Sequence, residues 1–263
     1  MTAPADSQQA VAVVTGASGG IGRAIAVELA SQCANLVLHF CSRRDAMAAT
    51  EAAVSATGAR LHIVQADLSD PDARQHLVDA AWDWQGRIDR WVHAAGADVL
   101  TGPARDWHFS RKIDYLWQVD VRGTIDCCRR AGRLMADTPL SPRPSITTLG
   151  WDQADHGMEG DSGEMFAAIK GAVAAFSRSL AQSLAPRVRV NCVSPGWIRT
   201  AWGETAESIW HHRAAQQSLA RRWGSPEDVA KVVAFVSSPR ADFVSGQVLH
   251  VNGGFCTYPG NHA

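Results

Sequence analysis

The stretch Thr15-Gly16-Ala17-Ser18-Gly19-Gly20-Ile21-Gly22 joins a short apolar run, 11–15, directly to a segment with apolar residues at helical spacing, 21–31. Its glycines at 16, 20 and 22 allow a tight turn, close approach of the backbone to a ligand and close packing of a helix on a strand. A helix that starts here presents its N-terminus to a phosphate group. Glycine spacing alone is weakly specific, but the strand–turn–helix context predicts a dinucleotide-binding turn.

The rest of the chain repeats this alternation of strand and helix. Further strands are expected at 35–40, 60–65, 90–95, 144–149, 187–193 and 247–251, and further helices at about 44–57, 71–84, 108–136, 162–184 and 226–237. The pattern is typical of βαβ units and predicts an α/β fold, a Rossmann-like doubly wound parallel sheet of about seven strands flanked by helices. Because no repeat or long linker divides the sequence, we expect residues 1–263 to form a single NAD(P)-binding domain.

Two segments interrupt the alternation, and we expect them at the ligand-binding edge of the sheet. Residues 194–222 contain three tryptophans without a strand signal, which is typical of a substrate loop. Residues 150–163 are rich in glycine and acidic side chains between a strand and a helix. Ligands of open α/β sheets bind outside the carboxyl ends of the strands, where both segments should lie.

Composition excludes several other classes of protein. The 263-residue chain has a formal net charge of −1, so no basic field attracts nucleic acid or an anionic membrane. No apolar run approaches the roughly 20 residues that span a bilayer. Residues 1–9 lack the pattern of a targeting segment. The six cysteines show neither a C-x-x-C pair nor a zinc spacing, so we expect a reduced, cytoplasmic protein without a metal.

Further segments follow the glycine-rich turn in a specific order. They are 66–68 (ADL), 93–96 (HAAG), 191–200 (NCVSPGWIRT), 224–230 (GSPEDVA) and 246–254. With these motifs the chain, from residue 11 to 254, resembles the short-chain dehydrogenase/reductase family, whose members are oxidoreductases with a nicotinamide cofactor. The resemblance implies that the cofactor contacts Gly16, Ser18, Gly20, Ile21, Gly22, Asp67, Leu68, Ala94, Ala95, Gly96, Lys170, Pro195, Gly196, Ile198 and Thr200.

The end of the second expected strand, 39–44 (HFCSRR), indicates which nicotinamide cofactor is used. An acidic residue there would accept both ribose hydroxyls of NAD(H), whereas arginines pair with the 2′-phosphate of NADP(H). No acidic residue lies between residue 39 and Asp45. The sequence H-F-x-S-R in this stretch is also similar to that of NADP-dependent members such as pteridine reductases. We therefore expect NADP(H) rather than NAD(H), with Ser42 and Arg43 as ligands. In the alternative, Arg43 and Arg44 are solvated charges at the start of a helix. The family has a basic residue at the position of Gly19 in many NADP-dependent members, and this chain does not.

The chain departs from the family pattern at the catalytic residues. The family uses a tyrosine as proton donor, a lysine four residues later, a serine at a strand end and an asparagine in the long helix before it. Lys170 matches the lysine, but Phe166 stands at the tyrosine position. Trp151, after Gly150, takes the place of the serine, and Asp120 that of the asparagine. Since phenylalanine donates no proton, the acid must come from another residue, from water or from the substrate.

Candidates for the missing acid lie mainly in segment 150–163. We select Asp152 and His156, because a histidine titrates near neutral pH and a carboxylate beside Lys170 could be held in a useful protonation state. We add Lys170 and Asp120; Asp120 either pairs with Lys170 or holds the water that the asparagine would hold. In the alternative interpretation this segment is an exposed acidic turn in which Asp161 or Ser162 caps the next helix.

Three other residues have no assigned chemistry in this scheme. His93 replaces the first asparagine of the family's N-N-A-G motif, and we expect a hydrogen-bonded structural histidine. The two tyrosines of the chain, Tyr115 and Tyr258, do not fit the catalytic position.

Aromatic residues near the expected site suggest the chemistry of the substrate. Trp151, Phe166, Trp197 and Trp202 are the candidate substrate contacts, and their flat apolar surfaces suit a planar or aromatic small molecule. By resemblance we also expect a homotetramer or homodimer that packs through the helices at 108–136 and 162–184 and through the C-terminal strand.

Two functions of different classes fit these observations. The first is an atypical NADP(H)-dependent dehydrogenase/reductase that acts on a carbonyl, alcohol or conjugated small molecule without the usual tyrosine acid. The alternative is a cofactor-binding protein without redox turnover: a sensor, a partner subunit, or a lyase or isomerase on the same scaffold.

Overall fold

The computed structural model describes residues 10–200, 203 and 207–256. Their centre is a seven-stranded sheet in the order β3-β2-β1-β4-β5-β6-β7, in which all neighbouring strands are parallel. The strands are β1 (Val11–Thr15), β2 (Asn35–Phe40), β3 (Arg60–Gln65), β4 (Arg90–His93), β5 (Ser145–Leu149), β6 (Arg189–Pro195) and β7 (Val248–Val251). The order reverses between β1 and β4, so the sheet is doubly wound and the predicted Rossmann-like α/β fold is confirmed.

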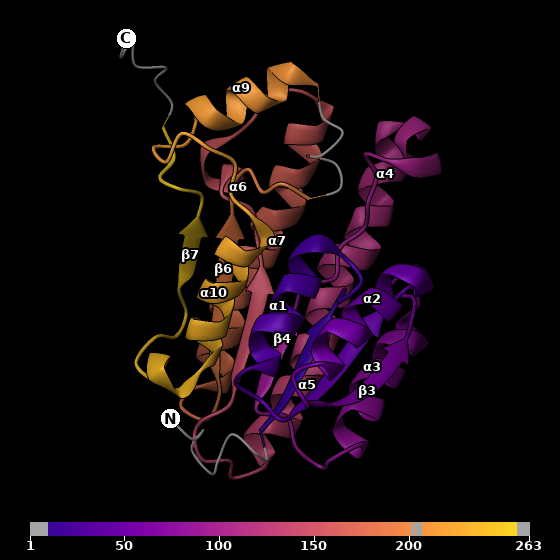
Figure 1. The fold of residues 1–263 in the computed structure, drawn as a ribbon, viewed down its shortest axis with the longest axis vertical. Helices are drawn as coiled ribbons and strands as arrows, with labels where there is room; N and C mark the ends of the chain where they lie inside the picture. The colour runs from indigo at the N-terminus through magenta and orange to yellow at the C-terminus, as the bar shows by residue number, and fades with distance from the viewer. Residues whose placement is uncertain (1–9, 201–202, 204–206, 257–263) are drawn as a thin grey trace.

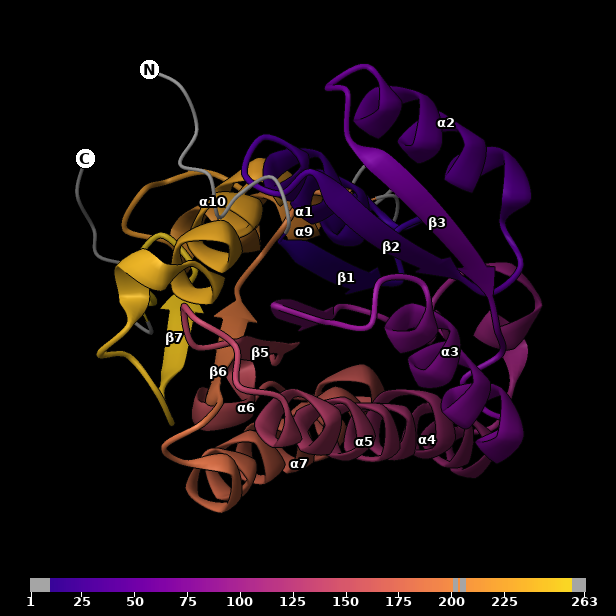
Figure 2. The same cartoon turned by 90° about the horizontal axis from the view of Figure 1, so that it is seen from below.

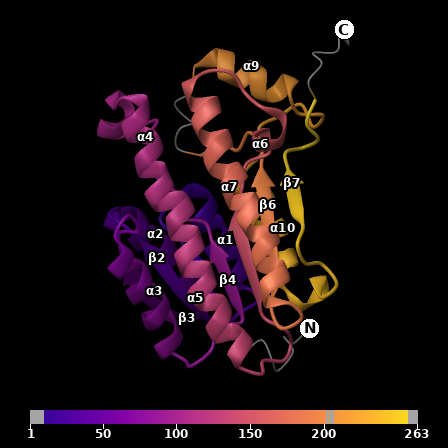
Figure 3. The ribbon, with the colours of Figure 1, turned by 180° about the vertical axis from the view of Figure 1, so that it is seen from behind.

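Two layers of helices enclose the sheet (Figures 1 and 2). One face is covered by α1 (Gly20–Ala30), α2 (Arg44–Ser55) and α10 (Pro226–Ser237). The other is covered by α3 (Pro71–Asp83), α4 (Phe109–Leu116), the π-helical turn η3 (Trp117–Arg122), α5 (Gly123–Asp137) and α7 (Asp161–Leu184), seen from outside in Figure 3. The shorter elements are η2 (Gly102–Asp106), α6 (Gln153–His156), α9 (Ser208–Gln216) and η4 (Pro239–Ala241).

A separate apolar core lies on each face of the sheet. Trp91 of β4 belongs to the core beneath α3 and α5, whereas its neighbour Val92 belongs to the core beneath α1 and α10. Both side chains are fully buried. Because both faces of a parallel sheet are covered, its central strands are apolar at almost every position, and this is why they could be found from sequence.

The carboxyl ends of the strands meet at one edge of the sheet, at the top of Figure 1, and α6 and α9 lie beyond that edge. The described parts of the two segments that interrupt the alternation, 150–163 and 194–222, therefore lie where the sequence predicts them. Both contain a helix that the sequence analysis did not predict. In α9 the only buried residue is Ala214, so the segment has no apolar stripe that would reveal a helix.

Several predicted element boundaries are wrong. β6 spans Arg189–Pro195 and not 187–193. β4 ends at His93 and not at Ala95, because the N–H groups of Ala94 and Ala95 both donate to the Thr15 hydroxyl at 3.0 Å instead of continuing the strand. The helix expected at 108–136 is divided into α4 and α5 by the wide turn η3.

The predicted cap of α7 is also wrong. The N-cap residue is Gly160, with φ +88°, and it makes no side-chain hydrogen bond to the helix. Asp161 already lies in the first turn, where its negative charge suits the positive end of the helix dipole.

The described residues include no helix that is long and apolar enough to cross a membrane. All six cysteines lie within the described ranges, and no disulfide bond joins any two of them.

Candidate active site

The glycine-rich turn after β1 has the close contacts that only glycine permits. Gly16 has φ +67°, and a Cβ atom added to it would stand 2.7 Å from the Cα atom of Ala95. A Cβ atom on Gly22 would collide with the carbonyl oxygen of Gly16. The turn therefore holds the start of α1 tightly against β1 and the end of β4, as a dinucleotide-binding turn requires.

His39 of β2 holds this turn in place through hydrogen bonds, a role that was not predicted from the sequence. The Gly16 N–H donates to His39 Nδ1 at 3.2 Å, and His39 Nε2 donates to the carbonyl oxygen of Ala66 at 3.0 Å. Burial lowers the pKa of His39, so the neutral ring can accept on one nitrogen and donate on the other. A histidine inside the apolar run NLVLHF was the available signal.

The two arginines after β2 have different surroundings. An Nη atom of Arg43 lies 3.5 Å from the position of a Cβ atom on Gly19, so its guanidinium group stands over the glycine-rich turn. Arg44 instead pairs with Glu51 of α2 at 3.4 Å, and its side chain is 59% exposed. The geometry therefore fits a phosphate beside Arg43, whereas Arg44 is a solvated helix-start charge.

The remaining predicted cofactor residues border the same edge. Asp67 Oδ1 accepts the Ser69 N–H at 2.9 Å, while Leu68 is buried. The Thr200 methyl group lies 3.6 Å from the position of a Cβ atom on Gly20, so the start of the 194–222 segment contacts the glycine-rich turn. Residues 94–96 follow β4, and Pro195, Gly196 and Ile198 lie at or just beyond the end of β6.

Lys170 and Asp120 form an ion pair, the first of the two arrangements considered for Asp120. Lys170 Nζ of α7 lies 2.9 Å from Asp120 Oδ2 of η3, and the Asp120 side chain is 2% exposed. The Ala97 N–H donates to Asp120 Oδ1 at 2.8 Å. Gly96 leaves room for this carboxylate, because a Cβ atom there would lie 2.9 Å from Asp120 Oδ2. The carboxylate thus has a donor on each oxygen and holds the ammonium group at the edge of the sheet.

Phe166 lies one turn before Lys170 on α7 and contacts Trp151. The two rings meet edge to face with centroids 6.3 Å apart, and both side chains are partly buried. The pair forms an apolar wall beside the lysine.

Tyr115 does not supply the missing phenol at this wall. Its ring packs against Trp107, with centroids 5.5 Å apart and near-perpendicular planes. Burial raises the pKa of Tyr115, and the negative charges of Asp67 and Asp120 act in the same direction. Tyr258 lies outside the described residues.

The hydrogen bonds of Asp152 and the ring contacts of His156 lie toward β7 and the C-terminal segment, not at the Lys170–Asp120 pair. Asp152 is buried, and its Oδ2 accepts from Asn252 at 3.0 Å. The His156 ring stacks on Phe255 with centroids 4.3 Å apart. Burial raises the pKa of Asp152. The structure therefore does not bring these two candidates to Lys170.

His93 differs from the expected hydrogen-bonded histidine. It is 2% exposed, and neither ring nitrogen has a hydrogen-bond partner among the described residues. Its ring lies parallel to Trp91, with centroids 6.5 Å apart. Burial lowers the pKa of His93 to about 3, and the positive charge of Lys170 contributes. The ring is therefore held neutral by apolar surroundings and nearby positive charge.

Trp197 belongs to an aromatic cluster formed with α9. Its ring lies 5.8 Å from both Trp210 and Trp223, and its Nε1 donates to Gln217 at 2.9 Å. These contacts join Trp197 to α9 and to Trp223. Trp202 lies outside the described residues.

A family model described as enoyl-(acyl carrier protein) reductase matches residues 16–256. The short-chain reductase NovJ of Streptomyces niveus is 33% identical over 97% of this chain and 99% of that protein. The chain belongs to the short-chain dehydrogenase/reductase family.

Further relatives agree with this membership. The 3-oxoacyl-[acyl-carrier-protein] reductase FabG of Aquifex aeolicus is 31% identical over 94% of this chain and 97% of its own. A family member from Brucella melitensis matches with a TM-score of 0.81 and 33% identity, covering 94% and 96% of the two chains. A dehydrogenase from Burkholderia cenocepacia solved with NADP matches with a TM-score of 0.82 and 30% identity, covering 94% and 98%.

Family membership makes this chain an oxidoreductase whose family uses nicotinamide cofactors. The glycine-rich turn fits such a cofactor, since two of its glycines leave no space for a side chain and keep the backbone open to a pyrophosphate.

Proposed function

We propose that this protein is an NADP(H)-dependent oxidoreductase that acts on a carbonyl, alcohol or conjugated small molecule, with Lys170 in place of the tyrosine acid. The observation that carries the proposal is the Lys170–Asp120 ion pair, which lies at the carboxyl edge of the sheet beside Phe166. The whole chain would act as one NAD(P)-binding domain, with residues 194–222 as its substrate loop.

Preference for NADP(H) rests on Arg43, assisted by Ser42. The Arg43 guanidinium stands over the glycine-rich turn, at the end of the strand that carries the ribose-binding residues in this fold. A planar guanidinium donates two parallel hydrogen bonds to a phosphate, which a ribose hydroxyl cannot match. The bound nicotinamide would supply or accept the hydride.

Lys170 is suited to complete the reduction with a proton. Its ammonium group has three N–H donors, and Asp120 occupies one of them. A carbonyl oxygen beside Phe166 would meet the ammonium directly, because no phenol stands between them. As the carbonyl carbon gains the hydride, the C=O π bond breaks, its electrons move to oxygen, and Lys170 transfers a proton to that oxygen. Water then returns a proton to the lysine.

The Trp151–Phe166 wall favours a substrate with a planar or aromatic group next to its carbonyl. Flat rings stack or pack edge to face with such groups and exclude water from the reacting bond. A carbonyl conjugated with a ring also stabilises charge on its oxygen, which lowers the demand on the acid. Relatives named 3-oxoacyl-[acyl-carrier-protein] reductases make 3-oxoacyl thioesters a second group of compounds to test.

The replacement of the tyrosine and the serine by Phe166 and Trp151 favours a second candidate. In this alternative the chain binds NADP(H) without redox turnover, as a sensor, a partner subunit, or a lyase or isomerase. Titration with NADPH and assay of its oxidation against aryl ketones and 3-oxoacyl thioesters separate the two. Binding with oxidation supports the reductase, binding without oxidation supports the alternative, and lack of binding contradicts both.

Substitution of Arg43 tests the preference for NADP(H), and substitution of the neighbouring Arg44 is the control. We expect Arg43→Ala to weaken NADPH binding about 10- to 100-fold, because it removes charge-assisted hydrogen bonds, and to leave NADH binding nearly unchanged. Arg44→Ala removes a charge of the same sign one residue away and should alter neither. Equal losses of NADPH and NADH affinity in Arg43→Ala would contradict the 2′-phosphate assignment.

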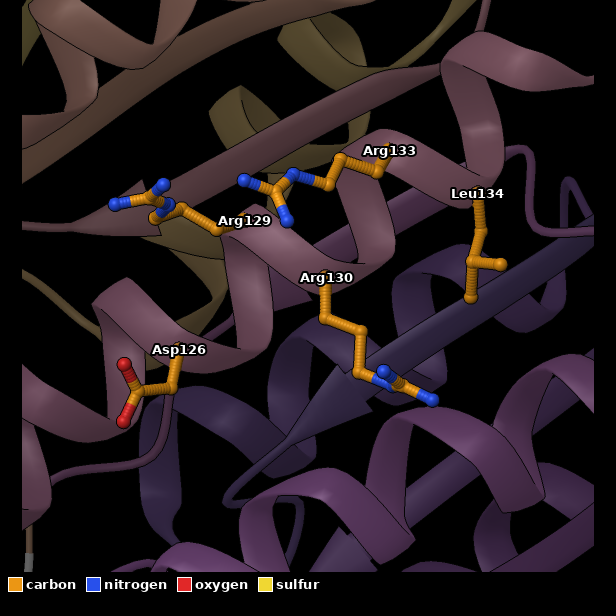
Figure 4. Close-up of a pocket in the computed structure, with 5 residues that line it drawn as sticks. All are labelled: Asp126, Arg129, Arg130, Arg133 and Leu134. Carbon is orange, nitrogen blue, oxygen red and sulfur yellow. The ribbon is translucent and has the colours of Figure 1, made fainter.

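A homodimer or homotetramer in the cytoplasm completes the proposal. The outer face of α5 carries a cavity of about 460 Å³ lined by Asp126, Arg129, Arg130, Arg133 and Leu134, with the arginines fanned along the helix (Figure 4). The free thiols agree with a reducing compartment.

A further inference from the structure

We propose that Arg74 of α3 is a positioning residue that couples the adenosine side of the cofactor site to the Lys170–Asp120 pair. The proposal rests on the proposed function, because it assigns Arg74 a part in that same site. Arg74 is outside every motif that the sequence analysis used.

The guanidinium of Arg74 is buried, and each of its three nitrogens donates at least one hydrogen bond. Its side chain is 2% exposed. Nε donates to the Leu68 carbonyl oxygen at 2.7 Å, and Nη2 donates to the Ser69 carbonyl oxygen at 3.0 Å. These two bonds hold the loop that begins with Asp67, where the adenine contact is expected.

The same guanidinium also holds the wide turn η3. Nη2 donates to the backbone oxygen of Gln118 at 3.0 Å and to its side-chain oxygen at 3.3 Å, and Nη1 donates to Asp126 Oδ2 at 2.9 Å. The Gln118 carbonyl also accepts the Gly123 N–H in the π-helical pattern. Arg74 thus stabilises the register shift that separates α4 from α5.

Asp120 lies inside this turn, two residues after Gln118. A π-turn changes the direction of every side chain in it relative to a regular helix, and such turns often occur at functional sites. Here the turn directs the Asp120 carboxylate to Lys170 and to the Ala97 N–H. One buried cation therefore fixes both the cofactor loop and the carboxylate that holds the lysine.

A matched control exists on the same pair of helices. Arg130 of α5 donates to Asp79 of α3 at 2.6 Å, so it joins α5 to α3 as the Arg74–Asp126 contact does. It has no contact in this structure with the Asp67 loop or with η3. Arg74→Gln and Arg130→Gln each replace one α3–α5 cation by the same neutral amide.

Two readouts that do not need turnover report the two ends of the coupling. Calorimetric titration with 2′,5′-ADP, the adenosine half of the cofactor, reports the Asp67 loop. The ¹³Cε signal of Lys170 reports the ion pair, and it is readily assigned because the chain has only three lysines, Lys112, Lys170 and Lys231.

We expect Arg74→Gln to weaken 2′,5′-ADP binding about tenfold or more and to shift the Lys170 signal, because it loses several charge-assisted hydrogen bonds. Arg130→Gln should change neither. If Arg74→Gln does not fold, Asp126→Ala decides: it removes one acceptor of Arg74 and should shift Lys170, whereas Arg122→Ala, which removes only the exposed partner of Asp126, should not.

An unmoved Lys170 signal in folded Arg74→Gln, or in Asp126→Ala where Arg74→Gln does not fold, would overturn the proposal. Equal effects of Arg74→Gln and Arg130→Gln would overturn it as well, since they would indicate general loosening of α3 against α5. Failure of the wild type to bind 2′,5′-ADP would instead contradict the NADP(H) function, while the Lys170 signal would still test the positioning role.

Discussion

Lys170 is held at the edge of the sheet by a carboxylate that itself has little freedom. Asp120 is almost fully buried and has a donor on each oxygen, the lysine on one and the Ala97 N–H on the other. Removing one member of a buried ion pair typically costs about 3–5 kcal/mol, because the other charge remains without compensation. Asp120→Asn is therefore the safer probe of the pair, since it removes the buried carboxylate while its one amide oxygen can still accept from either Ala97 or Lys170.

The buried ring of His93 makes the stability of the protein depend on pH. Its pKa is about 3 in the folded protein because of burial, whereas the ring in the unfolded chain takes up a proton near pH 6.5. The unfolded state binds more protons between these values, so stability is fully present above pH 6.5 and falls as the pH decreases toward 3. We expect His93 to lower the free energy of unfolding by about 2 kcal/mol between pH 7 and pH 5.

Urea unfolding of the wild type and of His93→Leu at pH 7 and pH 5 measures this contribution. The variant should lose less stability on acidification than the wild type, by about the same 2 kcal/mol. Identical losses in the two proteins would contradict a neutral, buried ring.

Single residues were predictable from sequence where a motif defines their surroundings. Gly16, Asp120 and Lys170 lie as the family pattern implies, because backbone turns and strand ends determine those positions. Asp152 and His156 were selected from a loop whose path depends on distant residues such as Asn252 and Phe255, and no local pattern reveals such partners.

Helix α9 is held to its neighbours by side-chain contacts of Arg213. Arg213 donates to both carboxylate oxygens of Glu159, at 2.7 and 2.9 Å, and lies beside the rings of Trp197 and Trp210. Glu159 precedes α7, so this ion pair connects the two loops that border the site.

We expect Glu159→Gln to speed hydrogen exchange in Ser208–Gln216 several-fold while leaving the global unfolding temperature nearly unchanged, because Glu159 is exposed and such pairs contribute little to stability. Glu51→Gln, which breaks the exposed Arg44–Glu51 pair, is the control and should leave α9 unaffected. Unchanged exchange in α9 would show that the aromatic cluster alone holds the helix.

Elements of the sheet were predictable because buried parallel strands are nearly continuous apolar runs, as β1 and β2 are. The division of the 108–136 helix was not, because the wide turn η3 is stabilised by Arg74, about 40 residues earlier in the chain. Periodicity reports one face of a helix and carries no information on such long-range partners.

The molecule as a whole leaves large apolar side chains exposed near β7. Phe243, between η4 and β7, is fully exposed, and Phe235 of α10 is 44% exposed. Exposed aromatic side chains are typical of a contact with another protein, and they support the proposed homodimer or homotetramer.

Light scattering should therefore give the mass of a dimer or tetramer for the wild type and a lower mass for Phe243→Asp. Because the Phe243 side chain has no buried surface to lose within its own subunit, the variant should still fold. A monomeric wild type, or an unchanged mass in the variant, would contradict this contact.

Hydride transfer with Lys170 as the proton donor is tested by following deuterium from C4-deuterated NADPH into an aryl ketone in a single turnover. Asp120→Asn and Asp120→Asn/Lys170→Met are compared, so that no buried carboxylate is left unpaired. We expect deuterium in the product of the wild type, and transfer at least about 100-fold slower in the double variant than in Asp120→Asn, with similar NADPH affinity. Equal rates in the two variants would contradict Lys170 as the proton donor. NADPH binding without deuterium in any product would contradict hydride transfer.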